Sequence, residues 1–280
     1  MKYIEIKAPA KINIGLNILS RREDGYHNLS TLFYPINDLY DVLTFEESTK
    51  FEFVCHTESI PGNDSNLVVK AKNLIERLTG KILPVKINLY KRIPAQAGLG
   101  GGSSDAAATL ICLNEFFQLG IKTEKILELA LELGSDVPFF VKSKPAIGKS
   151  RGELLEYVDI EIAEPILIVN PGINISTKEA FQNIAPSYTD FNFTGLIQES
   201  KPDYSVLRAN LKNDFEDYVF GKYPEIGKIK KTMYDDGALF ASLSGSGSSV
   251  YGIFSTIDAA ANSALKLSDQ PFVFISNPQD

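Results

Sequence analysis

The sequence contains few of the residues from which metal sites and disulfide frameworks are built. Its 280 residues include two cysteines, two histidines and no tryptophan. Cys55 and Cys112 share no zinc-type spacing with His27 and His56, so we expect no structural zinc site. Two thiols in a chain of this length are typical of a reducing compartment. A core here needs neither a disulfide nor a metal, because a chain of this size buries about 75% of its unfolded surface.

Long hydrophobic runs and an excess of basic charge are also missing. No segment approaches the roughly 18 apolar residues of a membrane-spanning helix, and no basic region precedes an apolar run at the start. The 28 Lys and Arg residues against 35 Asp and Glu give a net charge of -7, which repels nucleic acid. We therefore expect a cytoplasmic protein that binds neither membranes nor nucleic acid. An anionic ligand would have to be held by local donors.

What is present is the composition of a folded protein, with 44% hydrophobic and 22% charged residues. Strand patterns alternate with helix patterns and predict an α+β protein of two lobes, 1–150 and 151–280. From Ala10 to Ile18 apolar and polar residues alternate, which predicts a strand with Lys11, Asn13 and Asn17 on one face. We further expect strands over 29–36, 41–47, 51–55, 85–89, 154–158, 166–170, 238–243, 250–254 and 272–275, and helices over 67–78, 224–235 and 256–267.

Capping residues and breakers predict where some elements begin and end. Asn66 is placed to cap the helix over 67–78, which Gly80 would end, and Thr123 is placed to cap a further helix that Gly134 would end. The polar, proline-bearing stretch 184–204 fits neither pattern, and we expect it to be a mobile insertion.

The run Gly98-Leu99-Gly100-Gly101-Gly102-Ser103-Ser104 lies between a predicted strand and a predicted helix. Glycine allows the backbone to approach a ligand closely and to adopt a positive φ. The helix that follows offers unpaired N–H groups and the positive end of its dipole. The run therefore predicts a phosphate-binding loop.

Two common phosphate-binding patterns do not fit this chain. Gly148-Lys149-Ser150 has Ser143 where the Walker pattern needs its first glycine. The dinucleotide pattern, started at Gly98, has Ser103 where its third glycine belongs. A second small-residue loop, 242–249, lies between two apolar strands. By itself such a loop is more often a tight hairpin, but with the first loop it suggests a phosphate held from two sides.

Three motifs resemble those of the superfamily of galactokinase, homoserine kinase, mevalonate kinase and phosphomevalonate kinase, and they occur in the order found there. They are Pro-Ala-Lys-Ile-Asn at 9–13, Pro-Ala-Gln-Ala-Gly-Leu-Gly-Gly-Gly-Ser-Ser-Asp-Ala-Ala at 94–107, and Ser-Gly-Ser-Gly at 244–247. Within the superfamily, Gly-Tyr-His at 25–27 and Leu-Gly-Ser-Asp-Val-Pro-Phe-Phe at 133–140 look like the members that phosphorylate cytidine diphosphate methylerythritol in the non-mevalonate route to isoprenoids. The resemblance runs from about residue 8 to residue 255.

The resemblance implies a fold and a set of roles. It implies an N-terminal ATP-binding lobe like the second domain of ribosomal protein S5, a C-terminal ferredoxin-like lobe, and an active site in the cleft between them. Asp136 would be the general base and Lys11 would stabilise the developing charge. On the residues alone, a turn or helix cap is the commoner role for a single aspartate such as Asp136, and Lys11 could be an exposed strand lysine.

Ligand-binding residues are implied in the same way. ATP, with Mg²⁺ on its phosphates, would contact Asn66, Lys91, Pro94, Ala95, Gln96, Ala97, Gly98, Leu99, Gly100, Gly101, Gly102, Ser103 and Ser104. The substrate cytosine would stack between Tyr26 and Phe181, with His27 at its edge and Asn13 near the hydroxyl-bearing chain. Ser244 and Gly245 would complete the substrate site. Core packing is the commoner role for an aromatic side chain, and His27 could be a turn histidine.

The sequence departs from the related motifs at two positions. Ser150 stands where related chains usually have glycine, which leaves a substrate contact there open, and Ser246 stands where threonine is frequent. Alternatives are a kinase for mevalonate or homoserine, and a non-catalytic protein that binds a nucleotide or phosphosugar. The Tyr26-His27 pair argues against the first alternative. The retention of Lys11 and Asp136 argues against the second. We expect a monomer or a weak homodimer, and the metal ligands are not assigned.

Overall fold

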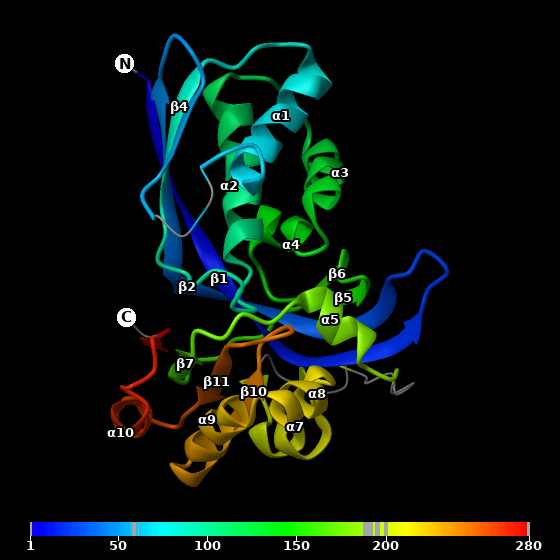
Figure 1. The fold of residues 1–280 in the computed structure, drawn as a ribbon, viewed down its shortest axis with the longest axis vertical. Coiled ribbons are helices and arrows are strands. Elements are labelled where there is room, and N and C mark those ends of the chain that lie inside the picture. Colours follow the sequence, from blue (N-terminus) through cyan, green and yellow to red (C-terminus); the bar gives the residue numbers. More distant parts are fainter. Residues whose placement is uncertain are drawn as a thin grey trace. The chain divides into compact units, whose positions relative to one another are not determined.

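The computed structural model describes residues 2–57, 60, 62–186, 193, 197–198 and 201–278. The chain forms two compact units from interleaved segments. Unit 1 comprises 1–10, 39–95 and 100–143, and unit 2 comprises 11–38, 96–99 and 144–280. This differs from the single division near residue 150 expected from the sequence. The physical reason is that the two long first strands, β1 (Tyr3–Arg21) and β2 (His27–Glu47), each contribute to both units (Figure 1).

Unit 1 is a sheet covered by helices. Besides the first part of β1 and the last part of β2, it contains β3 (Glu52–Cys55), β4 (Val85–Tyr90), α1 (Leu67–Thr79), α2 (Gly101–Phe116), α3 (Thr123–Leu133) and α4 (Val137–Lys142). β4 pairs antiparallel with β2, with Val42 opposite Tyr90, and parallel with β3. The four helices lie on one side of these strands (Figure 1).

Unit 2 contains the remaining strands of the six-stranded sheet to which the strands of unit 1 belong, and a separate four-stranded sheet. In the first, Leu29–Phe33 of β2 pairs antiparallel with β5 (Ala146–Ser150), which pairs with β6 (Leu154–Tyr157). The second has the order β10-β11-β7-β12, and all its neighbours are antiparallel. Its strands are β7 (Ile166–Asn170), β10 (Phe240–Leu243), β11 (Val250–Ile253) and β12 (Phe272–Ser276), and the short pair β8 (Ile197–Gln198) and β9 (Lys201–Pro202) stands apart. The helices are α5 (Thr177–Gln182), α7 (Tyr204–Asn210), α8 (Phe215–Lys222), α9 (Pro224–Asp235) and α10 (Ile257–Lys266).

Most expected elements are confirmed, and the exceptions have local causes. The Asn66 side chain caps α1 by accepting from Val68 N, and Gly80 ends the helix with a left-handed φ of 66°. The cap at Thr123 is wrong, because Thr123 is already helical and Lys122 holds the cap position. The runs over 29–36 and 41–47 form one strand. The strand β5 and the helices α4, α5, α7 and α8 were not expected from the sequence. These helices span six to eight residues, which is too few to show a clear apolar repeat.

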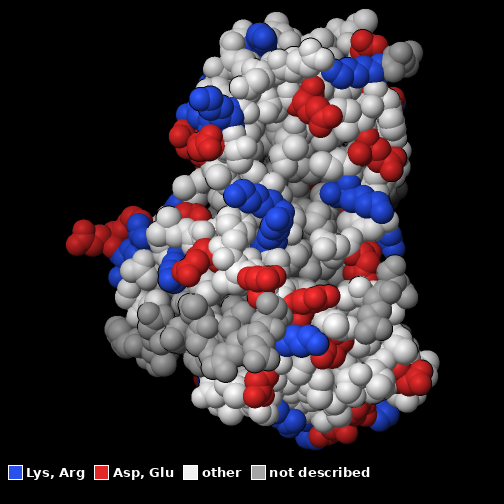
Figure 2. Space-filling view, turned by 180° about the vertical axis from the view of Figure 1, so that it is seen from behind, with Lys and Arg blue, Asp and Glu red and all other residues white. Residues whose placement is uncertain are grey.

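Three further expectations concern membrane-spanning helices, the stretch 184–204 and basic surface charge. In the described part of the chain no helix is long and apolar enough to cross a membrane. Much of the stretch 184–204 lies outside the described residues, so its expected mobility stays a prediction. On the face seen in Figure 2, described Lys and Arg side chains lie among Asp and Glu without forming a continuous basic stripe.

Candidate active site

The glycine-rich run is divided between a loop and the start of a helix. α2 begins at Gly101, inside the run, so Gly101–Ser104 forms its first turn rather than a loop. Gly100 holds the cap position with φ 73°, and it has no side chain with which to satisfy the N–H groups of that turn. The sequence therefore places unpaired donors and the positive end of the helix dipole at this point, as the phosphate-binding prediction requires.

In unit 2, Gly98 is packed directly against the second small-residue loop. A Cβ at Gly98 would lie 2.0 Å from the Ser244 carbonyl oxygen, and its φ of 77° also favours glycine. The Ser249 N–H donates to the Ala97 carbonyl at 3.1 Å. The two loops that the sequence analysis paired are therefore in contact.

The Gly98 carbonyl is also where the three sequence motifs meet. Its oxygen lies 3.0 Å from Lys11 Nζ and 2.9 Å from Ser244 Oγ, both of which donate to it. Lys11 comes from the first motif, Gly98 from the second and Ser244 from the third. One backbone oxygen thus accepts from two side chains whose residues are 87 and 146 positions away from Gly98 in the sequence.

Lys11 is a buried lysine and not an exposed strand residue. It is 2% exposed, and its ammonium donates to Asn13 Oδ1 at 2.5 Å. The Asn13 amide in turn donates to Thr31 Oγ1 at 3.0 Å, and the Tyr251 hydroxyl donates to the Asn13 carbonyl. Lys11 and Asn13 do share one face of β1, as alternation predicted. A buried ammonium in a fixed network is suited to stabilising charge on a transferred group.

Asp136 lies in unit 1 at the point where α3 has ended and α4 begins. Gly134 terminates α3, and Asp136 holds the cap position of α4. Its carboxylate makes no capping hydrogen bond within α4, all of whose residues are described. Phe139 and Phe140, both buried, anchor the segment. Asp136 therefore does not cap α4 through its side chain, and its role as the general base stays a prediction.

Asn66 and Lys91, both expected to contact ATP, differ in their surroundings. Asn66 uses its side-chain oxygen to cap α1. Lys91 is buried and forms ion pairs with Asp41 and with Asp105, the latter at 2.7 Å. We call these three residues the buried ion cluster. It was not predicted, and its members all belong to unit 1.

Burial dominates the electrostatics of the ion cluster. Burial raises the pKa of Asp105 to about 7, while the neighbouring Lys91 ammonium acts to lower it. Asp41 Oδ1 also accepts from the backbone N–H groups of Arg92 and Ile93, at 2.6 and 2.9 Å. The cluster thereby fixes the end of β4 beside the first turns of α2, since Asp105 belongs to that helix.

The aromatic residues expected around cytosine lie in unit 2. Phe181 stacks on His27, with ring centroids 5.1 Å apart, and meets Phe215 edge-on. Tyr26 is 52% exposed, and the guanidinium of Arg151 lies over its ring, 4.6 Å from the ring centroid. As the side chains lie here, His27 and not Tyr26 is the ring against Phe181. Binding of a pyrimidine between Tyr26 and Phe181 stays a prediction.

Ser150, where the resemblance led us to expect glycine, has a backbone conformation that favours glycine. Ser150 has φ 62°, a left-handed conformation that costs a non-glycine residue energy. Its hydroxyl accepts from Arg22 at 2.8 Å and donates to Glu153 at 3.0 Å. The substituted serine is thus held by two side chains from neighbouring turns.

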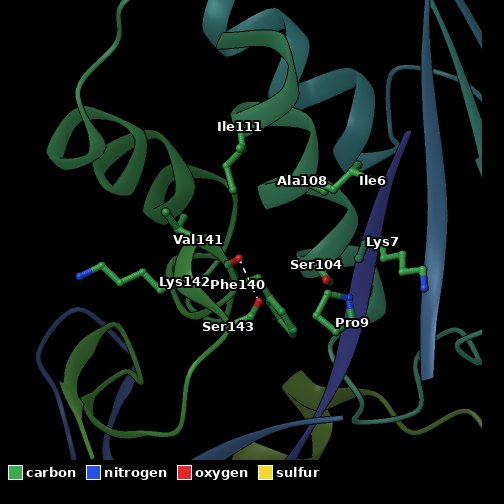
Figure 3. Close-up of a pocket in the computed structure, with 11 residues that line it drawn as sticks. Ile6, Lys7, Pro9, Ser104, Ala108, Ile111, Phe140, Val141, Lys142 and Ser143 are labelled. Carbon is green, nitrogen blue, oxygen red and sulfur yellow. Dashed lines mark hydrogen bonds between the residues drawn. The ribbon is translucent and has the colours of Figure 1, made fainter. Parts of the chain in front are cut away.

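Unit 1 contains a cavity of about 240 Å³ beside the first turn of α2. Its lining is mostly apolar, and the side chain of Lys142 points away from it (Figure 3). The labelled lining residues are Ile6, Lys7, Pro9, Ser104, Ala108, Ile111, Phe140, Val141, Lys142 and Ser143. Such a lining has too few donors to hold a phosphate, and we assign it no role.

Comparison with known proteins agrees with these observations. The family models for the GHMP kinases N terminal domain and the GHMP kinases C terminal domain match residues 66–144 and 196–271. A homoserine kinase from Cytophaga hutchinsonii shares the fold, with a TM-score of 0.76 at 18% identity over 99% of this chain and 95% of that one. The expected α+β kinase fold is confirmed.

Relatives with higher identity narrow the family further. A 4-diphosphocytidyl-2-C-methyl-D-erythritol kinase of Bacteroides fragilis is 45% identical over 88% of this chain and 90% of its own. Its counterpart from Caldanaerobacter subterraneus is 40% identical over 99% and 97%. A crystal structure of 4-(cytidine 5'-diphospho)-2C-methyl-D-erythritol kinase has a TM-score of 0.84 at 32% identity, over 97% and 98%. The chain therefore belongs to the GHMP kinases, and within them to the family of the 4-diphosphocytidyl-2-C-methyl-D-erythritol kinases.

Proposed function

We propose that the protein transfers the γ-phosphate of ATP to the 2-hydroxyl of 4-diphosphocytidyl-2-C-methyl-D-erythritol, giving the 2-phosphate and ADP. The reaction belongs to the non-mevalonate route to isopentenyl diphosphate. The observation that carries the proposal is the meeting of the three kinase motifs at the Gly98 carbonyl, where Lys11 and Ser244 both donate. The names of the relatives supply the acceptor.

The transfer we propose is direct and in line, without a phosphoenzyme. Asp136 accepts the proton of the acceptor hydroxyl, and the buried ammonium of Lys11 stabilises the charge that develops on the transferred group. The N–H groups at the start of α2, with those of the Gly98–Gly100 segment, hold the ATP phosphates. Positioning and charge stabilisation supply most of the rate in this class of reaction.

Mg²⁺ is part of the proposal as the partner of ATP. Across the described residues, no group of three or more His, Cys, Asp or Glu side chains could hold a metal ion by itself. That arrangement fits Mg²⁺, which proteins often bind mainly through substrate phosphates and water. When bound it would neutralise charge on the phosphate oxygens. We also propose a cytoplasmic monomer or weak homodimer.

A coupled assay of ADP release tests the proposal. Purified protein with ATP and Mg²⁺ is given 4-diphosphocytidyl-2-C-methyl-D-erythritol, methylerythritol phosphate, mevalonate or homoserine. We expect turnover of the cytidylyl compound, very poor turnover of the base-free phosphate, and none of the other two. Equal turnover of mevalonate would leave only a general GHMP kinase activity, and no turnover of any acceptor would favour a binding protein.

The roles of the two catalytic residues are tested in the same assay. Asp136→Asn should lower kcat by about 10² to 10⁴ while ATP binding stays nearly intact. Lys11→Met should lower kcat by about 10² or more. Near-normal kcat in Asp136→Asn would return Asp136 to a structural role.

A further inference from the structure

Asn213 lies in the turn that precedes α8 and contacts the second small-residue loop. It is fully buried, and its side-chain amide donates to the carbonyl oxygens of Leu243 and Gly245, both at 2.8 Å. Its Oδ1 accepts from the Phe215 N–H at 3.0 Å. Every hydrogen-bonding atom of the amide group is therefore used, and two of the three bonds hold the loop.

The turn that carries Asn213 is itself anchored to β1. Leu16 and Asn213 form an isolated β-bridge, and the Ile18 N–H donates to the Asp214 carboxylate at 2.7 Å. Leu16 N–H donates to the Lys212 carbonyl at 3.1 Å. Asn213 thus connects the loop to the strand that supplies Lys11.

The loop contains two successive backbone donors. In the described part of the chain, the N–H groups of Gly245 and Ser246 have no protein acceptor. Both residues are buried. A buried N–H without an acceptor is costly, so its retention calls for a ligand or a bound water. Successive N–H groups of this kind form an anion-binding concavity.

Asn213 determines where one of these donors points. The carbonyl of Gly245 and the N–H of Ser246 belong to one planar trans peptide and point in opposite directions. Because the Gly245 carbonyl is fixed on Asn213, the Ser246 N–H is directed away from Asn213. A Cβ at Gly245 would lie 3.3 Å from the Gly98 carbonyl oxygen and 3.5 Å from Asn13 Oδ1, so the loop lies close to the Lys11 network.

We propose that Asn213 is a positioning residue, which orients the Gly245–Ser246 peptide so that its N–H binds a phosphate oxygen during the reaction. The inference rests on the proposed kinase function. The oxygen can belong to the acceptor or to ATP, and the kinetic constants distinguish the two. Loss of an oriented N–H donor of this kind lowers the reaction rate by a large factor. A donor that points elsewhere or faces water does not bind the phosphate oxygen in its place.

The test compares Asn213→Asp and Asn213→Ala with wild type. Asn213→Asp keeps the acceptor for Phe215 but replaces the amide donor by a carboxylate oxygen that faces two carbonyls. Asn213→Ala removes the donor without adding charge. We expect both to lower kcat/KM for at least one of the two substrates by about 10- to 100-fold. A rise in acceptor KM alone assigns the oxygen to the acceptor, a rise in ATP KM alone assigns it to ATP, and a fall in kcat alone assigns it to the transferred group.

A control variant at a second asparagine, Asn114, distinguishes a loss of positioning from a loss of folding stability. Asn114 in α2 clamps a turn in the same manner, donating to the Ile121 carbonyl and accepting from the Ile121 N–H, both at 2.9 Å. Asn114→Asp should lower thermal stability but leave kcat/KM within about twofold of wild type. All assays are run well below the lowest melting temperature. Unchanged kinetic constants in both Asn213 variants, or losses that match those of Asn114→Asp at equal stability, would overturn the proposal.

The outcome stays informative if the proposed function is wrong. If wild-type protein does not phosphorylate the cytidylyl acceptor, binding of ATP and of CDP is measured by titration calorimetry. Weaker binding of either nucleotide to Asn213→Asp, with unchanged binding to Asn114→Asp, would support the positioning role for a different kinase. Equal binding to wild type and both variants would refute it.

Discussion

Replacement of Lys91 by methionine should destabilise the protein strongly, because it leaves two buried carboxylates without their cation. The side chains of Lys91, Asp41 and Asp105 are 7%, 0% and 4% exposed. Removal of one partner from a buried ion pair costs about 3–5 kcal/mol. Methionine retains most of the apolar stem, so little of the loss comes from packing.

Proton uptake limits the cost at neutral pH. The pKa of Asp105 is already raised to about 7 by burial, and loss of the Lys91 ammonium removes the largest influence that lowers it. The Asp105 carboxyl group of Lys91→Met therefore takes up a proton near pH 7. We expect the lower end of the range, about 3 kcal/mol, and a larger loss at higher pH.

Thermal unfolding followed by circular dichroism measures this loss. Each kcal/mol corresponds to about 2–4 °C in a domain of this size, so the melting temperature of Lys91→Met should fall by about 6–12 °C. If the two units unfold separately, the transition of unit 1 should move. The control is Lys149→Met, whose ion pair with Glu156 spans 3.0 Å but is 56% and 52% exposed. It should lose less than about 1 kcal/mol.

Two results would refute this reasoning. Equal melting temperatures for Lys91→Met and Lys149→Met would mean that the buried charges do not depend on each other. The double variant Lys91→Met with Asp105→Asn should regain part of the stability, because it removes one of the two carboxylates. A double variant less stable than Lys91→Met would contradict the electrostatic origin of the loss.

Three further predictions follow from the site. Asp105 is more basic in the folded protein than the ordinary aspartate pKa of about 3.9, so its contribution to stability is lost as pH rises from about 4 to about 7. In a pH series of melting temperatures, Asp105→Asn should therefore lose less stability than wild type over this range, and parallel curves would exclude this titration. Gly98→Ala should lower kcat/KM sharply, because its Cβ would lie 2.0 Å from the Ser244 carbonyl oxygen, and normal kinetics would show that the two loops can separate. Tyr26→Ala and Phe181→Ala should each raise the acceptor KM by about 5- to 150-fold, from stacking of about 1–3 kcal/mol, with ATP KM unchanged as the internal control.

The elements that sequence reasoning located correctly have local causes. Asn66 caps α1 because its side chain reaches an N–H two residues ahead, and Gly80 ends the same helix because it can adopt a left-handed φ. Thr123 has the same capping chemistry, yet the helix begins one residue earlier. The choice there depends on how α3 packs, which the identity of a single residue does not encode.

The ion cluster could not be predicted because it depends on pairing between distant segments. Asp41 and Lys91 are 50 positions apart, and they meet because Val42 pairs with Tyr90 where β2 and β4 run antiparallel. A shift of that register by one residue would place the two side chains on opposite faces of the sheet. Asp105 then joins from α2. The identities of these three residues alone do not show that their side chains meet inside the protein.

The position of the Lys11 ammonium is set by contacts that no single motif contains. A carbonyl oxygen has two lone pairs, and that of Gly98 accepts one hydrogen bond from Lys11 and one from Ser244. Gly98 packs directly against the second small-residue loop. Asn213 holds that loop by donating to the carbonyl oxygens of Leu243 and Gly245. The strand β1 brings the lysine to this region, but the loop geometry determines where its charge lies. The three motifs therefore indicate the chemistry of the site. Asn213, a buried residue outside all three motifs, contributes to the alignment of the groups that carry out this chemistry.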